Sequence, residues 1–222
     1  MSEQPDHSKS TRAAGTVLLG LCALALLFMA HHPTLGAPGY DTLAEEAAAE
    51  SGLNGLVHGM LIAITAGFFV CLAMFAELLN RNYFLTRAGL SVFGIATLTM
   101  IGAALVSGFI VPETARKLLS AGMANEFEPI LRMFGATNQT LAETGVIAYG
   151  AGMLLWGARL VRMSGFARIS GLAGLAGGAA LAGGILSGQL HLNVQGMTMA
   201  LAIMCAWFVL AAVMMIRGGS SK

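Results

Sequence analysis

Residues 196–216 read GMTMALAIMCAWFVLAAVMMI and hold no charged side chain. Because an α-helix rises about 1.5 Å per residue, about twenty apolar residues cross the roughly 30 Å hydrocarbon core of a bilayer. The rest of the chain has the same character: of its 222 residues, 56% are hydrophobic and 10% are charged, whereas a soluble domain has about 25% charged residues. The sequence therefore predicts a polytopic integral membrane protein. A net charge of +1 without a basic block also excludes nucleic acid as a partner.

Six apolar segments are long enough to span a bilayer, which predicts an all-α fold with a single six-helix transmembrane domain, residues 13–216. Residues 1–12 and 217–222 are the predicted tails. We expect the first segment to be retained, because the bulky Phe28 two positions before Ala30 does not suit signal-peptide cleavage. The predicted spans are about 13–30, 55–79, 88–112, 137–161, 169–190 and 196–216.

The distribution of basic residues predicts that both termini are cytoplasmic. Lys and Arg are retained on the cytoplasmic side of a membrane, and this orientation leaves only Arg116, Lys117 and Arg132 of the 12 basic residues outside. The loop 31–54 holds acidic residues and no Lys or Arg, which fits an outer location. This pattern favours the inner membrane of a bacterium.

Two outer loops are expected to have structure of their own. Thr42 and Glu45 have the spacing of a capping box, and Gly52 ends the Ala/Glu-rich stretch that follows, so we expect a short acidic surface helix over 42–51. Residues 113–135 mix charged and apolar side chains, which predicts an amphipathic segment lying on the outer membrane face.

Small residues predict where the helices pack. Residues 171–190 hold glycines at four-residue spacing, which indicates a central helix. Such glycine-rich faces are also candidate docking surfaces for a membrane-protein partner or a second copy of the chain. With an offset of 81 residues, part of the segment 79–102 matches 160–183, which suggests a parallel repeat of the second and third spans in the fourth and fifth.

Polar side chains inside the spans are candidate functional residues, because each is costly in lipid. Glu143 lies about two turns inside the span 137–161, with Gln139 on its face and no cation three or four residues away. The histidines other than His7 lie on the predicted outer side. We therefore expect an outer polar pocket formed by His31, His32, His58, Asn138, Gln139, Glu143, Gln189, His191 and Asn193.

Imidazole and carboxylate groups are ligands for copper, zinc or iron, so the candidate metal ligands are His31, His32, His58, Glu143 and His191. His58 and His191, on different helices at similar depth, are also a candidate axial pair for haem b. The predicted function is electron transfer or the handling of a redox cofactor. Two alternatives stay open: a small-solute or proton-coupled transporter that uses Glu143, and a non-catalytic accessory or scaffold subunit of a membrane complex.

Several enzyme classes lack support in the sequence. It contains no GxSxG, Walker, HExxH or CxxCH motif, which argues against a hydrolase, a nucleotide-driven pump or a covalent haem protein. Cys22, Cys71 and Cys205 are isolated inside apolar segments and are expected to be core residues. The 14 methionines are expected to act mainly as apolar filler. Glu77 is expected to pair with Arg81 one turn later.

Overall fold

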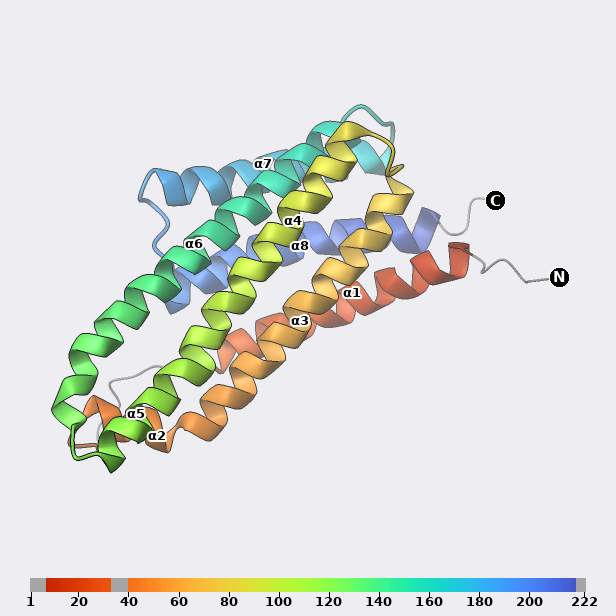
Figure 1. Cartoon of the computed structure of the whole chain (residues 1–222). Helices are drawn as coiled ribbons and strands as arrows, with labels where there is room; N and C mark the ends of the chain where they lie inside the picture. The colour runs from red at the N-terminus through yellow and green to blue at the C-terminus, as the bar shows by residue number, and fades with distance from the viewer. Residues whose placement is uncertain (1–6, 33–39, 219–222) are drawn as a thin grey trace.

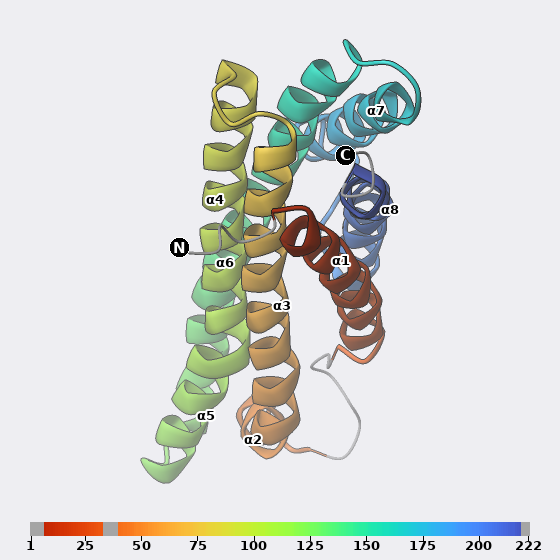
Figure 2. The ribbon, with the colours of Figure 1, turned by 90° about the vertical axis from the view of Figure 1, so that its right-hand side faces the viewer.

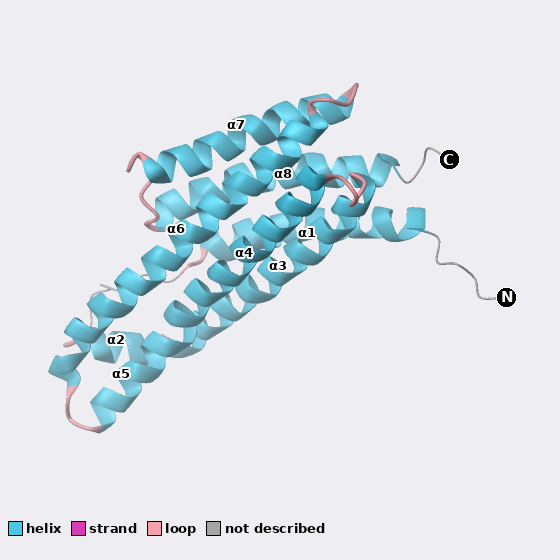
Figure 3. Cartoon of the chain, turned by 45° about the horizontal axis from the view of Figure 1, so that its top comes forward, coloured by secondary structure: helices cyan, strands magenta, loops and turns pink. Residues whose placement is uncertain are grey.

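The computed structural model of the chain describes residues 7–32 and 40–218, and all regular structure in these ranges is helical (Figure 3). A π-helix, η1 (Val106–Ile110), joins α4 to α5, and a 3-10 turn, η2 (Ala124–Glu126), precedes α6. The α-helices are α1 (His7–Ala30), α2 (Leu43–Ala49), α3 (Ser51–Leu78), α4 (Phe84–Leu105), α5 (Val111–Ser120), α6 (Phe127–Leu160), α7 (Phe166–Leu186) and α8 (Val194–Gly218).

The long helices form an up-and-down bundle (Figure 1, Figure 2). α4 packs against α3 and α6, α6 packs also against α7, and α1 packs against α8 and α3. Helices α1 and α8 bring both described ends of the chain together, since Arg12 Nε donates a hydrogen bond to the Ile216 carbonyl at 3.1 Å. We call this the terminal end of the bundle. The opposite end, which holds His32, α2 and η1, is the histidine end.

Within residues 7–32 and 40–218, five helical segments are long and apolar enough to cross a membrane, which indicates a multi-pass membrane protein. α6 is not among them, although its 34 residues include the predicted span 137–161 and pack between α4 and α7. Polar residues in its first half, Glu143 among them, lower its hydropathy. The five segments are Lys9–Ala30, Ser51–Leu78, Phe84–Ser120, Phe166–Leu186 and Val194–Gly218.

Residues 113–135 do not form the separate segment lying on the membrane that the sequence predicted. α4 continues through η1 into α5, and the residues from Phe127 onward already belong to α6. The amphipathic pattern arises because these helix ends bury one face against each other and against α2. The residues buried there are Ala44, Ala47, Val106, Val111, Ala115 and Phe127.

The short helix α2 confirms the predicted capping box. The Glu45 N–H donates to Thr42 Oγ1 at 3.2 Å, and the Thr42 N–H donates to Glu45 Oε2 at 3.1 Å. The helix ends at Ala49, whereas Gly52, which was expected to end it, lies inside α3. It is therefore shorter than predicted, and its buried face packs against α5.

The glycine-rich helix α7 lies at the edge of the bundle and not at its centre as predicted (Figure 2). It packs on α6 and α8, and α8 is the most buried of the five spanning candidates. The expected close contacts are nevertheless present: a Cβ added at Gly174 would lie 2.6 Å from Trp207 Nε1, and one added at Gly178 would lie 3.0 Å from Leu154 Cγ. The glycines thus serve packing within the chain.

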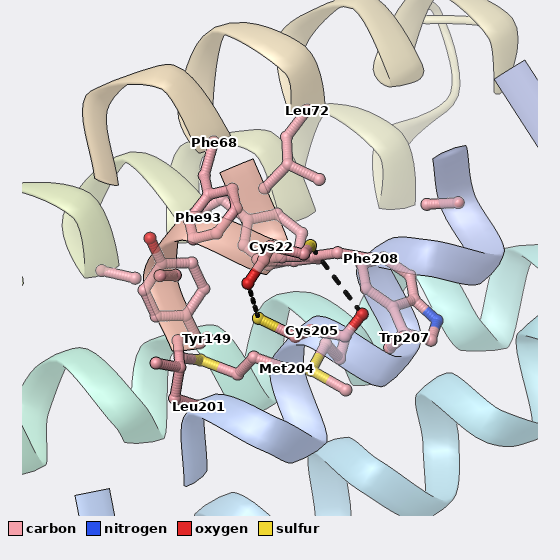
Figure 4. Packing of buried hydrophobic residues seen from close by; sticks show 14 of the residues in the cluster. Cys22, Phe68, Leu72, Phe93, Tyr149, Leu201, Met204, Cys205, Trp207 and Phe208 are labelled. Carbon is pink, nitrogen blue, oxygen red and sulfur yellow. Dashed lines mark hydrogen bonds between the residues drawn. The ribbon is translucent and has the colours of Figure 1, made fainter. Parts of the chain in front are cut away.

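Large aromatic side chains fill the core toward the terminal end, and Figure 4 shows Phe93, Trp207 and Phe208 among them. Trp156 Nε1 donates to the Thr86 carbonyl at 3.0 Å, and Trp207 Nε1 donates to the Ser170 carbonyl at 3.1 Å. Gly89 lets Trp156 approach, since a Cβ there would overlap the indole nitrogen. The other large aromatic residues of this core are Phe75, Phe93, Tyr149 and Phe208.

All three cysteines are buried and free, as expected of core residues. Cys22 Sγ lies 4.0 Å from the Cys205 carbonyl oxygen, and Cys205 Sγ lies 3.9 Å from the Cys22 carbonyl oxygen (Figure 4). These reciprocal contacts hold α1 against α8.

Several arginine side chains lie at the terminal end. Arg81 forms the predicted ion pair with Glu77, with an N–O distance of 2.9 Å. The Arg159 guanidinium lies 3.9 Å above the ring centroid of Tyr83, and that of Arg217 lies 5.3 Å from the centroid of Phe166. This end therefore carries basic side chains, two of which lie over aromatic rings.

Candidate functional site

Two histidines from different parts of the chain meet at the histidine end. His32 follows the last turn of α1, where its backbone N–H donates to the Met29 carbonyl at 3.2 Å. His58 lies two turns into α3 and is only 4% exposed. Their Nε2 atoms are 3.2 Å apart, and the rings meet edge to face with centroids 4.8 Å apart. We call these two residues the histidine pair.

The tautomer of His58 follows from its hydrogen bonds. Its Nδ1 lies 3.0 Å from the backbone carbonyl oxygen of Asn54. Because a carbonyl can only accept, Nδ1 carries the proton, and Nε2 of the neutral ring has a lone pair. In the contact between the rings, His32 Nε2–H therefore donates to His58 Nε2. The His58 lone pair is thus directed toward His32.

The π-helix η1 brings backbone close to the histidine pair. Asn54 Nδ2 donates to the Ser107 carbonyl at 2.8 Å. Gly108 lies directly against His58, since a Cβ at this position would overlap His58 Cβ. Single π turns occur mostly within α-helices and frequently at functional sites. Asn54 therefore has two roles: its side chain ties η1 to α3, and its carbonyl orients His58.

Two cavities meet at the histidine pair. The α2 cavity, of about 160 Å³, is bordered by α2, α3, η1, α5 and α6. The α8 cavity, of about 290 Å³, extends among α1, α3, α4, α6 and α8. The residues that line both cavities are His32, His58, Ser107 and Asn138. Both cavities are mostly apolar, and the one acidic side chain among the described lining residues is Glu50, at the α2 cavity.

Glu143 and Gln139 form the predicted interaction on one face of α6. Gln139 Nε2 donates to Glu143 Oε1 at 2.8 Å. Neither residue is among those that line the two cavities, whereas Asn138 lines both. The structure therefore does not bring Glu143 to the histidine pair.

His191 is also not brought to the pair. The prediction required the helix of residues 171–190 to persist to His191, but α7 ends at Leu186 and Gly188 has a positive φ of 69°. This left-handed conformation ends the helix. His191 and Gln189 are consequently exposed in the connection to α8.

The remaining predicted residues have separate positions. His31 is exposed, with Nδ1 2.9 Å from the Leu27 carbonyl oxygen. Asn193 lines the α8 cavity, and its Oδ1 accepts a hydrogen bond from the Gly196 N–H at 2.8 Å. Within residues 7–32 and 40–218, no group of three or more His, Cys, Asp or Glu side chains is arranged to hold a metal ion. Of the five candidate ligands, the structure joins His32 and His58.

Two residues beside the histidine pair, Asn54 and Ser107, were not among the predicted site residues. Asn54 had a readable signal, because it precedes His58 by four residues and shares its helix face. Ser107 had none, because a π turn shifts the register of side chains and cannot be read from helical periodicity.

Comparison with known proteins gives no family for the chain: no family model matches it, and neither a curated protein nor a solved structure gives a significant match.

Proposed function

We propose that the chain is a six-span inner-membrane protein with cytoplasmic termini and an outward-facing histidine end. The placement of Arg81, Arg159 and Arg217 at the terminal end supports this orientation. α6 serves as the remaining span, since it runs the length of the bundle between α4 and α7 (Figure 1). The pairs α3–α4 and α6–α7 both turn at the terminal end, in agreement with a parallel repeat.

In this proposal the histidine pair binds one transition-metal ion, for electron transfer or for the handling of a redox cofactor. The contact of 3.2 Å between His32 Nε2 and His58 Nε2 carries the proposal. Two imidazole nitrogens bound to a tetrahedral metal at about 2.0–2.1 Å stand about 3.3–3.4 Å apart. A change of the His32 tautomer leaves both Nε2 lone pairs available to a single ion.

The surroundings of His58 support ligation. A metal-bound histidine usually donates its second ring N–H to a carboxylate or a backbone carbonyl, and His58 Nδ1 does so to Asn54. Asn138, which lines both cavities, and water are available for the other positions around the ion. The contact favours an ion over haem b, because axial histidines of a haem lie on opposite faces of the macrocycle, whereas these two rings touch.

The two alternative functions have less support in the geometry. A transporter that uses Glu143 would need this carboxylate at a cavity, but it is bonded to Gln139 outside both. A scaffold that docks through α7 cannot use the face of Gly174 and Gly178, because these glycines contact α8 and α6, and it would have to use the exposed face around Gly183. Both remain predictions.

Elemental analysis of the detergent-purified protein tests the metal proposal. We expect about one metal ion per chain in the wild type and almost none in His32→Ala or His58→Ala. His31→Ala is the matched control, because it removes an exposed imidazole next to the pair and should retain the metal. Equal metal content in all four proteins, each eluting as a folded species, would falsify the proposal.

A further inference from the structure

The α8 cavity is lined by four methionines from three helices. Met29 comes from α1, Met100 from α4, and Met197 and Met204 from α8. Met197 and Met204 are seven residues apart and therefore share one face of α8. Figure 4 shows Met204 in the packed region with Leu201 and Tyr149, which also line this cavity. Thioethers thus border the space directly beyond the histidine pair.

The packing around Met100 places its sulfur between α4 and α6. A Cβ added at Gly145 of α6 would lie 2.7 Å from both Met100 Cγ and Met100 Sδ. Met29 lies three residues before His32 and is 5% exposed, and Met204 is 3% exposed. Met29 of α1 and Met204 of α8 are therefore buried at the cavity, whereas Met100 of α4 and Met197 of α8 are partly exposed.

The cavity offers soft, uncharged ligands. Thioether sulfur binds copper(I) in preference to zinc, magnesium or calcium, and imidazole also binds copper. No Asp, Glu, Lys or Arg is among the described residues that line the cavity. Because an uncompensated charge in an apolar space is costly, a singly charged soft cation fits this cavity better than a divalent one.

We propose that the α8 cavity is a copper(I) site in which methionine sulfurs extend the histidine pair into the bundle. This proposal rests on the proposed metal function of the pair and names the metal. The ion enters through the α2 cavity, where Glu50 lies, and reaches His32 and His58. Methionine sulfurs of the α8 cavity lining then supply further ligands; Met197 and Met204 lie about two turns apart on α8 and so serve successive positions. Copper is taken up as copper(I), so the binding step itself involves no change of oxidation state.

The test compares copper(I) and zinc binding in four purified proteins. Copper(I) affinity is measured without oxygen by competition with a chromogenic copper(I) chelator, and zinc binding by equilibrium dialysis. The proteins are the wild type, His58→Ala, Met197→Leu/Met204→Leu, and the control Met133→Leu/Met199→Leu. Leucine preserves volume and removes only the sulfur ligand. The control methionines are exposed, at 60% and 52%.

We expect the cavity double variant to bind copper(I) at least about tenfold more weakly while zinc binding is unchanged. His58→Ala should lose both metals, and the control should match the wild type. Unchanged copper(I) affinity in the cavity variant, with both metals lost in His58→Ala, would overturn the copper(I) site and leave the metal function of the pair intact. If His58→Ala keeps both metals, the function proposed for the pair is itself wrong. Should the double variant not fold, the single variants Met197→Leu and Met100→Leu make the same comparison.

Discussion

The terminal and histidine ends of the bundle differ in how they treat polar groups. At the terminal end, the indoles of Trp156 and Trp207 each donate to a backbone carbonyl, and glycines let the helices close over them. At the histidine end, a π turn, two cavities and an imidazole pair occupy the corresponding region. The terminal end is thus closely packed around its indoles, whereas the histidine end places imidazole and thioether side chains around two cavities. Substitutions of similar size should therefore affect stability at one end and binding at the other.

The largest effect is expected from Gly89→Ala at the terminal end. The added methyl group would overlap Trp156 Nε1 and displace the indole from the Thr86 carbonyl, which should lower the free energy of unfolding by about 2–3 kcal/mol. SDS titration in mixed micelles measures this change. Gly59→Ala is the control at the histidine end: its Cβ would lie 3.7 Å from Phe109 Cζ, an ordinary contact. Its stability should be unchanged or rise by about 0.5–1 kcal/mol. Equal losses in both variants would contradict the contrast between the two ends.

The next largest effect is expected on metal affinity, from Gly108→Ala in the π-helix. Its methyl group would overlap His58 Cβ and turn the imidazole away from His32, so metal affinity should fall about tenfold or more. Stability should fall as well, by about 1–2 kcal/mol, because His58 Cβ is fixed to the α3 backbone and α3 and η1 must move apart. Gly102→Ala is the comparison, since its Cβ would contact Leu141 Cδ1 at 3.4 Å, away from the pair. A metal titration in which both variants bind equally well would show that the position of His58 is unimportant.

A smaller effect is expected from Asn54→Ala. The substitution removes the hydrogen bond to the Ser107 carbonyl but keeps the backbone carbonyl that accepts from His58. We expect metal affinity to fall about three- to tenfold, because the pair is less firmly held, and stability to fall by about 1 kcal/mol. Asn82→Ala, at an exposed turn of the terminal end, should leave metal affinity unchanged. A stability loss without any change in affinity would assign Asn54 to packing alone.

The smallest effect is expected from Glu77→Gln. The ion pair with Arg81 is open to solvent, with side chains 49% and 61% exposed, so its loss should cost about 0.5 kcal/mol or less. The same SDS titration measures it, and the difference should shrink further at high salt. A loss of free energy of unfolding above about 1 kcal/mol would mean that this ion pair stabilises the protein more than solvent-exposed pairs usually do.

The features that could be predicted from the sequence are those within one helix. The capping box of Thr42 and Glu45, the pair Glu77–Arg81 and the pair Gln139–Glu143 all follow from spacings of three or four residues. Apolar runs of about twenty residues predicted six spans, and five helical segments among the described residues are long and apolar enough to cross a membrane.

The candidate site depended on features that periodicity does not contain. His32 meets His58 because the end of α1 approaches α3, although the two residues are 26 positions apart in the sequence. His191 is lost from the site because Gly188 ends α7 in a left-handed conformation, while the sequence pattern continues as if the helix did not stop. The register shift in η1 is equally invisible in the spacing of side chains.

The π-helix places one extra residue in the helix that runs from α4 to α5. Deleting one residue from Val106–Ile110 would leave the length of an ordinary α-helical turn, so the π turn would close and the helix beyond it would keep nearly the same facing. Val111 and Ala115 would still face the alanines of α2, whereas the Ser107 carbonyl and Gly108 would shift relative to Asn54 and His58. A single-codon deletion here would therefore alter the surroundings of the histidine pair, although it would leave composition and hydropathy almost unchanged.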